Sequence, residues 1–433
     1  MADRDNDNRL ERALDDGREW VAHTAEDVAD RLSHAWQSVR DRISDDDDSD
    51  AKTDEVAFND ATDDTEVFNR ERQREAERLG HANILIIGQT GVGKSTLINA
   101  VFRKPLAKAG TGRPVTKVIQ RFDDPDVPVT LYDTKGVELG DSKGRVIRDF
   151  KRTIAKSRKA APEEHIHLLW YCMDAGQTRV QDYDIEIIRA LAEEVPVILV
   201  FTQTIDDERA DALEATIREV DLPIAGGRAV RTLAESRRIK RQNLKPTGLE
   251  ELVRLTNELL PEAVSRAFIN AQGVVLDLKV DQSRAVVVGG AVAAAAAAAA
   301  PMPAADALVL KSIQLGMLAG VTAIFGVDLS NGQVMTLVKS VIGQGGVEKL
   351  GKKMVKELAK HLPGGNVVNA TVAASLTAAL GEAYIRLCSE MFRRRAAGKP
   401  MIDTEMLAYF IAAYEGLLRK PGGGEQPQAP EGP

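Results

Sequence analysis

The segment from Gly88 to Thr96 holds the residues of this chain that are best suited to chemistry. Its sequence, GQTGVGKST, satisfies the pattern G-x-x-x-x-G-K-[ST]. Glycines allow the backbone to point successive N–H groups inward, and a following helix adds partial positive charge at its start. Lys94 supplies a cation for terminal phosphates, and Ser95 supplies a hydroxyl for Mg²⁺. The predicted phosphate-binding residues are Gly88, Gln89, Thr90, Gly91, Val92, Gly93, Lys94, Ser95 and Thr96.

The segment VTLYDTKG, residues 129–136, predicts the other half of this site. Asp133 would end a strand near the metal, and the Gly136 amide would face the terminal phosphate. In GTGRPVTKVIQRF, Thr116 would complete the Mg²⁺ shell; Thr111 is the alternative, and either threonine could instead begin an edge strand. The predicted catalytic residues are Lys94, Thr116 and Gly136, and the predicted metal ligands are Ser95, Thr116 and Asp133.

The elements that must position these residues are short apolar runs separated by helical stretches. The runs are ANILIIG, VTLYD, HLLWYCMD, VPVILVFT and AVRTLA. Their alternation with helices predicts an α/β domain at 77–264, with a mostly parallel sheet between two layers of helices. The phosphate-binding segment lies between the first run and the helical stretch STLINAVF, as a strand-loop-helix site requires. PTGLEELVRLTNELL predicts a closing amphipathic helix.

The regions on either side of this domain have different compositions. Within 1–76, apolar residues at helical spacing over 10–43 predict an amphipathic helix, and the acidic stretch that follows predicts a flexible linker to about residue 69. Residues 265–420 are Ala-rich and predict an all-α domain, and 421–433 predict a disordered tail.

Bulk properties exclude several classes of function. A net charge of −8 argues against DNA as the partner. Cys172 and Cys388 are the only cysteines, which indicates neither a disulfide framework nor a zinc site. The acidic N-terminus is unlike a secretory signal, so a cytoplasmic location is expected. His165 and His167 are interpreted as neighbours on one strand face rather than metal ligands.

The uncharged stretch 285–305 leaves two interpretations open. It is long enough to cross a hydrocarbon core of about 30 Å as a helix. Alanine contributes little transfer free energy, however, and Gly289, Gly290, Pro301 and Pro303 interrupt the stretch. Small residues suit a tightly packed soluble bundle as well as a peripheral or integral membrane domain at the inner membrane.

These motifs resemble the Era-like branch of the translation-factor class of P-loop GTPases over about residues 82–261. GQTGVGKS, Thr116 and DTKG match its first three motifs. The stretch PAADALVLKSIQLGMLAGVTAIFGVDLS resembles a helical domain of unknown function found on bacterial membrane-associated GTPases. The resemblance implies GTP and GDP as ligands with Mg²⁺ as cofactor.

The chain departs from this family at the base-reading motif N/T-K-x-D. After VPVILVF it has TQTIDD, so that Thr202 and Gln203 occupy the first two positions and Asp206 comes one residue late. Alternatively, Gln203 and Asp206 hold the required separation, and Thr204 replaces the lysine. Ala234, at the end of AVRTLA, matches the motif whose backbone amide meets the guanine O6.

A hydrophobic residue, Val137, follows Gly136 where some GTPases have the glutamine that orients water. Hydrolysis is therefore expected to be slow without an activating protein or self-association. The leading hypothesis is a GTP-dependent switch that couples nucleotide state to a helical partner-binding or membrane-binding domain. The alternatives are an ATP-dependent P-loop enzyme and a GTP-driven membrane scaffold.

Overall fold

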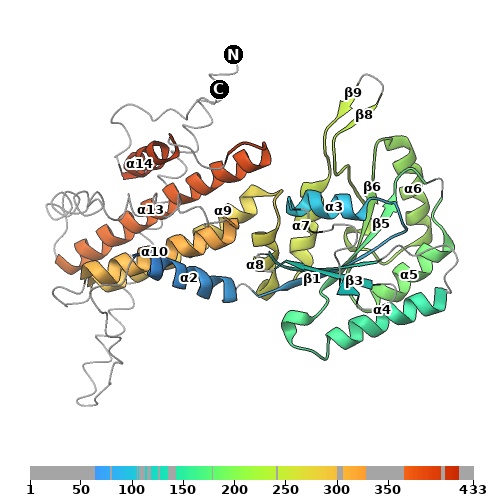
Figure 1. Cartoon of the computed structure of the whole chain (residues 1–433), viewed down its shortest axis with the longest axis horizontal. Helices are drawn as coiled ribbons and strands as arrows, with labels where there is room; N and C mark the ends of the chain where they lie inside the picture. Colours follow the sequence, from blue (N-terminus) through green and yellow to red (C-terminus); the bar gives the residue numbers. More distant parts are fainter. Residues whose placement is uncertain are drawn as a thin grey trace. The chain divides into compact units, whose positions relative to one another are not determined.

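A computed structural model of the chain describes residues 64–78, 80–104, 106, 113–114, 119–124, 127–134, 143–177, 179–239, 242–299, 306–327, 365–400 and 405–418. The chain divides into two compact units, residues 77–279 and a helical unit from residue 280 that includes α2 (Asp64–Arg78) (Figure 1). The predicted helix at 10–43 and the C-terminal tail lie outside the described residues. The linker prediction is wrong for residues 64–69, because α2 begins at Asp64 and buries Phe68.

The first unit is built on a seven-stranded sheet with the order β2-β3-β4-β1-β5-β6-β7. All pairings from β4 to β7 are parallel, and β2 and β3 add an antiparallel edge. The strands are β1 (Ala82–Ile87), β2 (Arg113–Pro114), β3 (Ile119–Asp124), β4 (Val127–Thr134), β5 (Leu168–Asp174), β6 (Val197–Thr202) and β7 (Val230–Arg231). The predicted mostly parallel α/β sheet is confirmed, with β1 at its centre.

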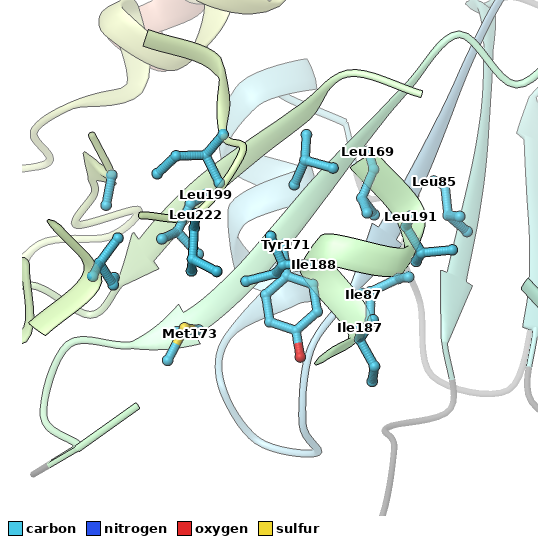
Figure 2. Packing of buried hydrophobic residues seen from close by; sticks show 14 of the residues in the cluster. Leu85, Ile87, Leu169, Tyr171, Met173, Ile187, Ile188, Leu191, Leu199 and Leu222 are labelled. Atoms are coloured by element: carbon cyan, nitrogen blue, oxygen red, sulfur yellow. The ribbon is translucent and has the colours of Figure 1, made fainter. Parts of the chain in front are cut away.

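Strand β1 shows why both faces of the sheet need helices. Successive side chains of a strand point to opposite faces. Leu85 and Ile87 pack with α4, α5 and α6, as part of the cluster drawn in Figure 2, whereas Ile84 and Ile86 pack with α3, α7 and α8. These helices are α3 (Lys94–Phe102), α4 (Lys143–Ser157), α5 (Asp182–Ala192), α6 (Asp207–Val220), α7 (Leu249–Leu259) and α8 (Glu262–Ala271).

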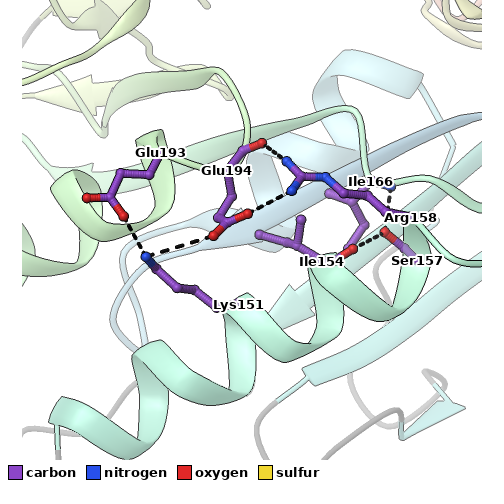
Figure 3. Close-up of polar contacts among 7 residues, drawn as sticks. All are labelled: Lys151, Ile154, Ser157, Arg158, Ile166, Glu193 and Glu194. Carbon is purple, nitrogen blue, oxygen red and sulfur yellow. Dashed lines mark hydrogen bonds and ion pairs between the residues drawn. The ribbon is translucent and has the colours of Figure 1, made fainter.

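Ion pairs fasten α4 to the end of α5 (Figure 3). Lys151 Nζ lies 2.6 Å from a Glu193 carboxylate oxygen and 3.8 Å from one of Glu194, and Arg158 pairs with Glu194 at 2.8 Å. Exposed pairs of this kind each contribute little, although three together restrict the orientation of α4. This matters for the site because α4 is the first described element after Gly136, whose amide is predicted to face the terminal phosphate.

The compact unit extends past the expected boundary at residue 264, to Lys279. Phe268 of α8 is fully buried and meets Phe102 of α3 edge to face, with ring centroids 6.2 Å apart. Two short 3-10 turns (Pro162–Glu164 and Ala225–Gly227) and a hairpin, β8 (Arg237–Ile239) with β9 (Gln242–Leu244), complete this unit. Sequence patterning predicted neither the hairpin nor the strand β3.

The helical unit contains α2, most of α9 (Leu276–Ala299), α10 (Asp306–Phe325), α13 (Gly365–Ala396) and α14 (Glu405–Leu418). Small residues allow close packing between these helices: a Cβ added at Gly381 would lie 2.4 Å from a Val287 methyl group. Polar groups are buried there as well. Arg284 of α9 makes two hydrogen bonds, of 2.9 and 3.1 Å, to the buried Glu382 of α13.

Candidate functional site

The loop from Gly88 to Gly93 follows the central strand β1 directly, at its carboxyl end. Gly88 lies so close to β5 that an added Cβ would come within 2.4 Å of the Cys172 carbonyl oxygen. Gly91 and Gly93 have φ values of +83° and +95°, which side chains other than glycine rarely tolerate. The three glycines therefore serve a tight loop that is seated on the sheet.

Lys94 is the most constrained side chain of this loop, with 7% of its surface exposed. Its Nζ donates hydrogen bonds to the Gly88 carbonyl at 2.9 Å and to the Gln89 carbonyl at 3.0 Å. The lysine thus folds back over the loop and concentrates positive charge there. It is also the first residue of α3, where the opening N–H groups of a helix have no partner within the helix.

The start of α3 is suited to a bound anion. Gly93 precedes the helix without a side-chain cap, and the first turn contains no acidic residue. Uncapped N–H groups and the helix dipole together favour phosphate at such a position. Of the other predicted loop residues, Val92 is buried, Thr90 and Ser95 are exposed, and Thr96 is half-buried.

Asp133 and Ser95 are the two predicted metal ligands that the structure describes. Asp133 is buried near the end of β4 and pairs in register with Ile86, two residues before the loop. Lys94 and Asp133 both act electrostatically on the Cys172 thiol, whose pKa burial raises to about 12. A carboxylate and a hydroxyl fit Mg²⁺, which prefers oxygen ligands and retains several waters. Thr116 and Gly136 lie outside the described residues.

Thr202, at the end of β6, holds the loop from the neighbouring side. Its buried hydroxyl lies within donor distance of two carbonyls, those of Val92 in the loop and Met173 on β5. A hydroxyl has one proton and donates to one carbonyl at a time. Thr202 therefore helps to fix the position of the loop relative to β5.

Gln203 has an unusual backbone for a residue with a side chain, with a φ of +54°. Its side-chain nitrogen donates to Asp174 at 2.9 Å and to the Gly91 carbonyl at 3.3 Å. Its side-chain oxygen accepts a hydrogen bond of 2.6 Å from Arg237. Gln203 thus connects β5, the loop and the β8–β9 hairpin.

The Asp206 carboxylate binds at the start of α6 rather than in the hollow beside the loop. Its carboxylate caps α6 by accepting from the Arg209 N–H at 3.3 Å, and it forms an ion pair of 3.2 Å with the Arg209 side chain. The two other members of the motif, Thr202 and Gln203, line the hollow beside the loop, whereas Asp206 is not among its lining residues.

The hollow beside the loop has a volume of about 160 Å³. One wall comes from the loop and α3, a second from the end of β6, and a third from the segment after β7. Its lining residues are Gly91, Gly93, Thr96, Leu97, Thr202, Gln203, Leu233, Ala234, Glu235 and Arg237. The predicted base-contacting residue Ala234 lines this hollow together with the apolar Leu97 and Leu233.

Comparisons with known proteins identify two domains in the chain. Residues 83–203 match the family described as 50S ribosome-binding GTPase, which covers the loop, Asp133 and the first two residues of TQTIDD. The chain carries a P-loop GTPase domain. Residues 269–409 match the domain of unknown function DUF697, so the predicted order of a GTPase domain and a helical domain of unknown function is confirmed.

Several GTPases are similar to the GTPase domain. GTPase Der of Wolinella succinogenes is 32% identical over 130 residues, which are 29% of this chain and 26% of Der. The tRNA modification GTPase MnmE of Janthinobacterium sp. (strain Marseille) is 32% identical over 143 residues, 32% of this chain and 29% of MnmE. The chain thus spans less than a third of the length of these two relatives.

A septin GTPase domain from Chlamydomonas reinhardtii is a more distant structural neighbour. The sequence identity is 14%, and the alignment covers 43% of this chain and 89% of that one, with a TM-score of 0.29.

Three functional candidates around the GTPase domain's hollow escaped prediction: Asp174, Glu235 and Arg237. Asp174 ends the predicted strand HLLWYCMD, and an acidic residue at the carboxyl end of a parallel strand is a usable signal. Glu235 and Arg237 belong to a polar segment without periodicity, so only the folded chain brings them to the site.

Proposed function

We propose that the GTPase domain binds GTP with Mg²⁺ and hydrolyses it slowly, as the nucleotide-dependent part of a molecular switch. The observation that carries this proposal is the glycine loop at the end of β1, closed by the buried Lys94 and followed by the uncapped start of α3. Ser95 and Asp133 would hold Mg²⁺, which neutralises phosphate charge when bound. Thr116 and Gly136 would complete the switch as the predicted ligand and amide.

We assign the hollow beside the loop to the base of the nucleotide. The Ala234 backbone amide would donate to the guanine O6, and Leu97 and Leu233 would flank the base. A donor there favours guanine, whose O6 accepts, over adenine, whose amino group at that position donates. GTP is accordingly proposed over ATP.

Slow hydrolysis follows from Val137 after Gly136, since a valine side chain has no polar group to orient the attacking water. An activating protein or a second copy of the chain would then supply the missing polar group. We place the domain in the Era-like branch on its first three motifs and propose that nucleotide state alters how the helical unit meets its partner.

A membrane role for the helical unit is a second candidate, favoured by one observation. Among the described helices, α9 alone has the length and apolar composition to cross a bilayer, and a third of its most apolar window is buried within the structure. This criterion is also met by core helices of soluble proteins. The pairing of the half-buried Arg284 with the buried Glu382 supports a packed bundle, so we propose peripheral rather than spanning contact with the membrane.

A nucleotide competition assay on the full chain tests the proposal. Purified protein is loaded with a fluorescent GDP analogue in the presence of Mg²⁺ and challenged with GTP, GDP, ATP and ADP. Displacement by guanine nucleotides at concentrations at least tenfold lower than adenine nucleotides is expected. Equal or stronger displacement by ATP would instead support an ATP-dependent enzyme.

A further inference from the structure

A chain of hydrogen bonds runs across the carboxyl end of the sheet, from the hairpin to β5. Arg237 Nη2 donates to Gln203 Oε1 at 2.6 Å, Gln203 Nε2 donates to Asp174 Oδ2 at 2.9 Å, and the Gly176 N–H donates to Asp174 Oδ1 at 2.8 Å. A guanidinium only donates and a carboxylate only accepts. This series of hydrogen bonds therefore fixes the orientation of the Gln203 amide and holds the Arg237 guanidinium beside it.

The backbone at Gln203 is constrained in favour of this arrangement. The left-handed φ of +54° is uncommon for a residue with a side chain and clusters at functional positions. The next residue, Thr204, donates its N–H to the Thr232 carbonyl at 3.0 Å. Gln203 is thus held where its side chain reaches both the phosphate loop and the hairpin.

In the alignment that puts Thr202 and Gln203 at the first two positions of N/T-K-x-D, Gln203 stands where the motif has a lysine, whose side chain shields the base. Glutamine has no charge to offer there, yet the residue bonded to it is a cation. Gln203 and Arg237 both line the hollow together with the apolar Leu97 and Leu233. A guanidinium is planar and weakly hydrated, and it stacks on aromatic rings and on nucleobases.

We propose that Arg237, held by Gln203, stacks on the nucleobase and supplies the cation that the base-reading motif of this chain lacks. This assignment rests on the proposed nucleotide-binding function and adds a residue from outside the motifs. Because Arg237 is the first residue of β8, it also makes the hairpin β8–β9 part of the nucleotide site.

Three variants of the full chain test this assignment. Arg237→Ala removes the stacking cation, and Arg238→Ala removes the adjacent exposed arginine, which does not line the hollow. The double variant Gln203→Lys with Arg237→Ala restores a lysine at the motif position. Calorimetry measures the affinity of each for GDP and, separately, for inorganic triphosphate, which has no base.

Arg237→Ala is expected to weaken GDP binding by about 3- to 30-fold and to leave triphosphate binding within about twofold. Arg238→Ala should match the wild type, and the double variant should recover GDP affinity to within about threefold. Unchanged GDP binding by Arg237→Ala would overturn the assignment, and so would an equal loss of triphosphate binding or a failed recovery. A wild-type chain that binds triphosphate but no guanine nucleotide would instead refute the proposed function.

Discussion

At the scale of single residues, Lys94 and Thr202 hold the phosphate loop at different points along it. Lys94 donates hydrogen bonds to the carbonyls of Gly88 and Gln89, and the Thr202 hydroxyl lies within donor distance of the Val92 carbonyl. Both side chains are buried, so each replacement changes the loop more than it changes the surface. They are expected to differ in effect, because only Lys94 carries a charge for phosphate.

Lys94→Met keeps most of the buried aliphatic stem and removes the charge. Hydrogen bonds to charged groups are worth about 1.5–3 kcal/mol, so GTP affinity should fall by roughly 10- to 150-fold. Titration calorimetry with GTP and Mg²⁺ measures the change. Lys159→Ala, at an exposed lysine beyond α4, is the matched control and should bind normally. Wild-type affinity in Lys94→Met would remove the loop from the site.

Thr202→Val removes one hydroxyl at nearly constant volume. The Val92 and Met173 carbonyls then lose that buried donor, which should lower the free energy of unfolding by about 1–3 kcal/mol and weaken GTP binding by loosening the loop. Thr202→Ser retains the hydroxyl and should retain affinity. Urea denaturation and GTP titration follow both variants; a valine variant that behaves like the serine variant would contradict this role.

At the scale of elements, the apolar strands and the loop could be predicted, whereas the polar edge could not. Strand β1 is buried at all six positions, so its composition alone reveals it. Strand β3 reads IQRFDD and the two hairpin strands read RRI and QNL, so neither presents an apolar run. The same polar segment contains Arg237, which explains why the motif residues were predicted and their partner was not.

The domain boundary shows a second limit of patterning. Composition becomes Ala-rich after residue 265, yet Phe268 packs against Phe102 in the GTPase domain's core. Trp170 of β5 likewise donates to the Thr256 hydroxyl of α7 at 3.0 Å. Local composition predicts that a segment is helical. Side chains distant in sequence determine which domain core that helix packs against.

Two histidines at the amino ends of β1 and β5, His81 and His167, make stability depend on pH. The Asn83 N–H donates to His167 Nδ1 at 3.0 Å, so that nitrogen must be unprotonated. Burial lowers the pKa of His167 below its ordinary value of 6.5, and burial also lowers the pKa of His81 nearby. The unfolded chain therefore binds more protons, and stability is complete above pH 6.5 and falls as the pH drops through the lowered value.

His167→Gln removes one of these titrating groups. The loss of unfolding free energy between pH 7 and pH 5.5 should be smaller in this variant than in the wild type, because one fewer proton is taken up on unfolding. Urea denaturation at a series of pH values gives the two slopes. Identical slopes would contradict a lowered pKa of His167 in the folded protein.

At the scale of the whole molecule, the helical unit depends on close approach between helices. An added Cβ at Gly381 would meet Val287 at 2.4 Å, while an added Cβ at Gly289 would meet nothing within 4 Å. Gly381→Ala should therefore lower unfolding free energy by about 1–3 kcal/mol through overpacking. Gly289→Ala should raise it by about 0.5–1 kcal/mol through helix propensity. Thermal unfolding of the full chain compares the two, and equal effects would argue against the α9–α13 packing.

The same packing determines how the full chain should behave at a membrane. Insertion of α9 would separate Arg284 from the buried Glu382 and carry an ionised residue toward hydrocarbon, at a cost of about 2.5–3.5 kcal/mol near the bilayer centre. Alanine-rich surface recovers little of that cost. We therefore expect any chain that floats with anionic liposomes to be released by alkaline carbonate. Retention in the carbonate-washed vesicles would show that α9 leaves the bundle and spans the bilayer.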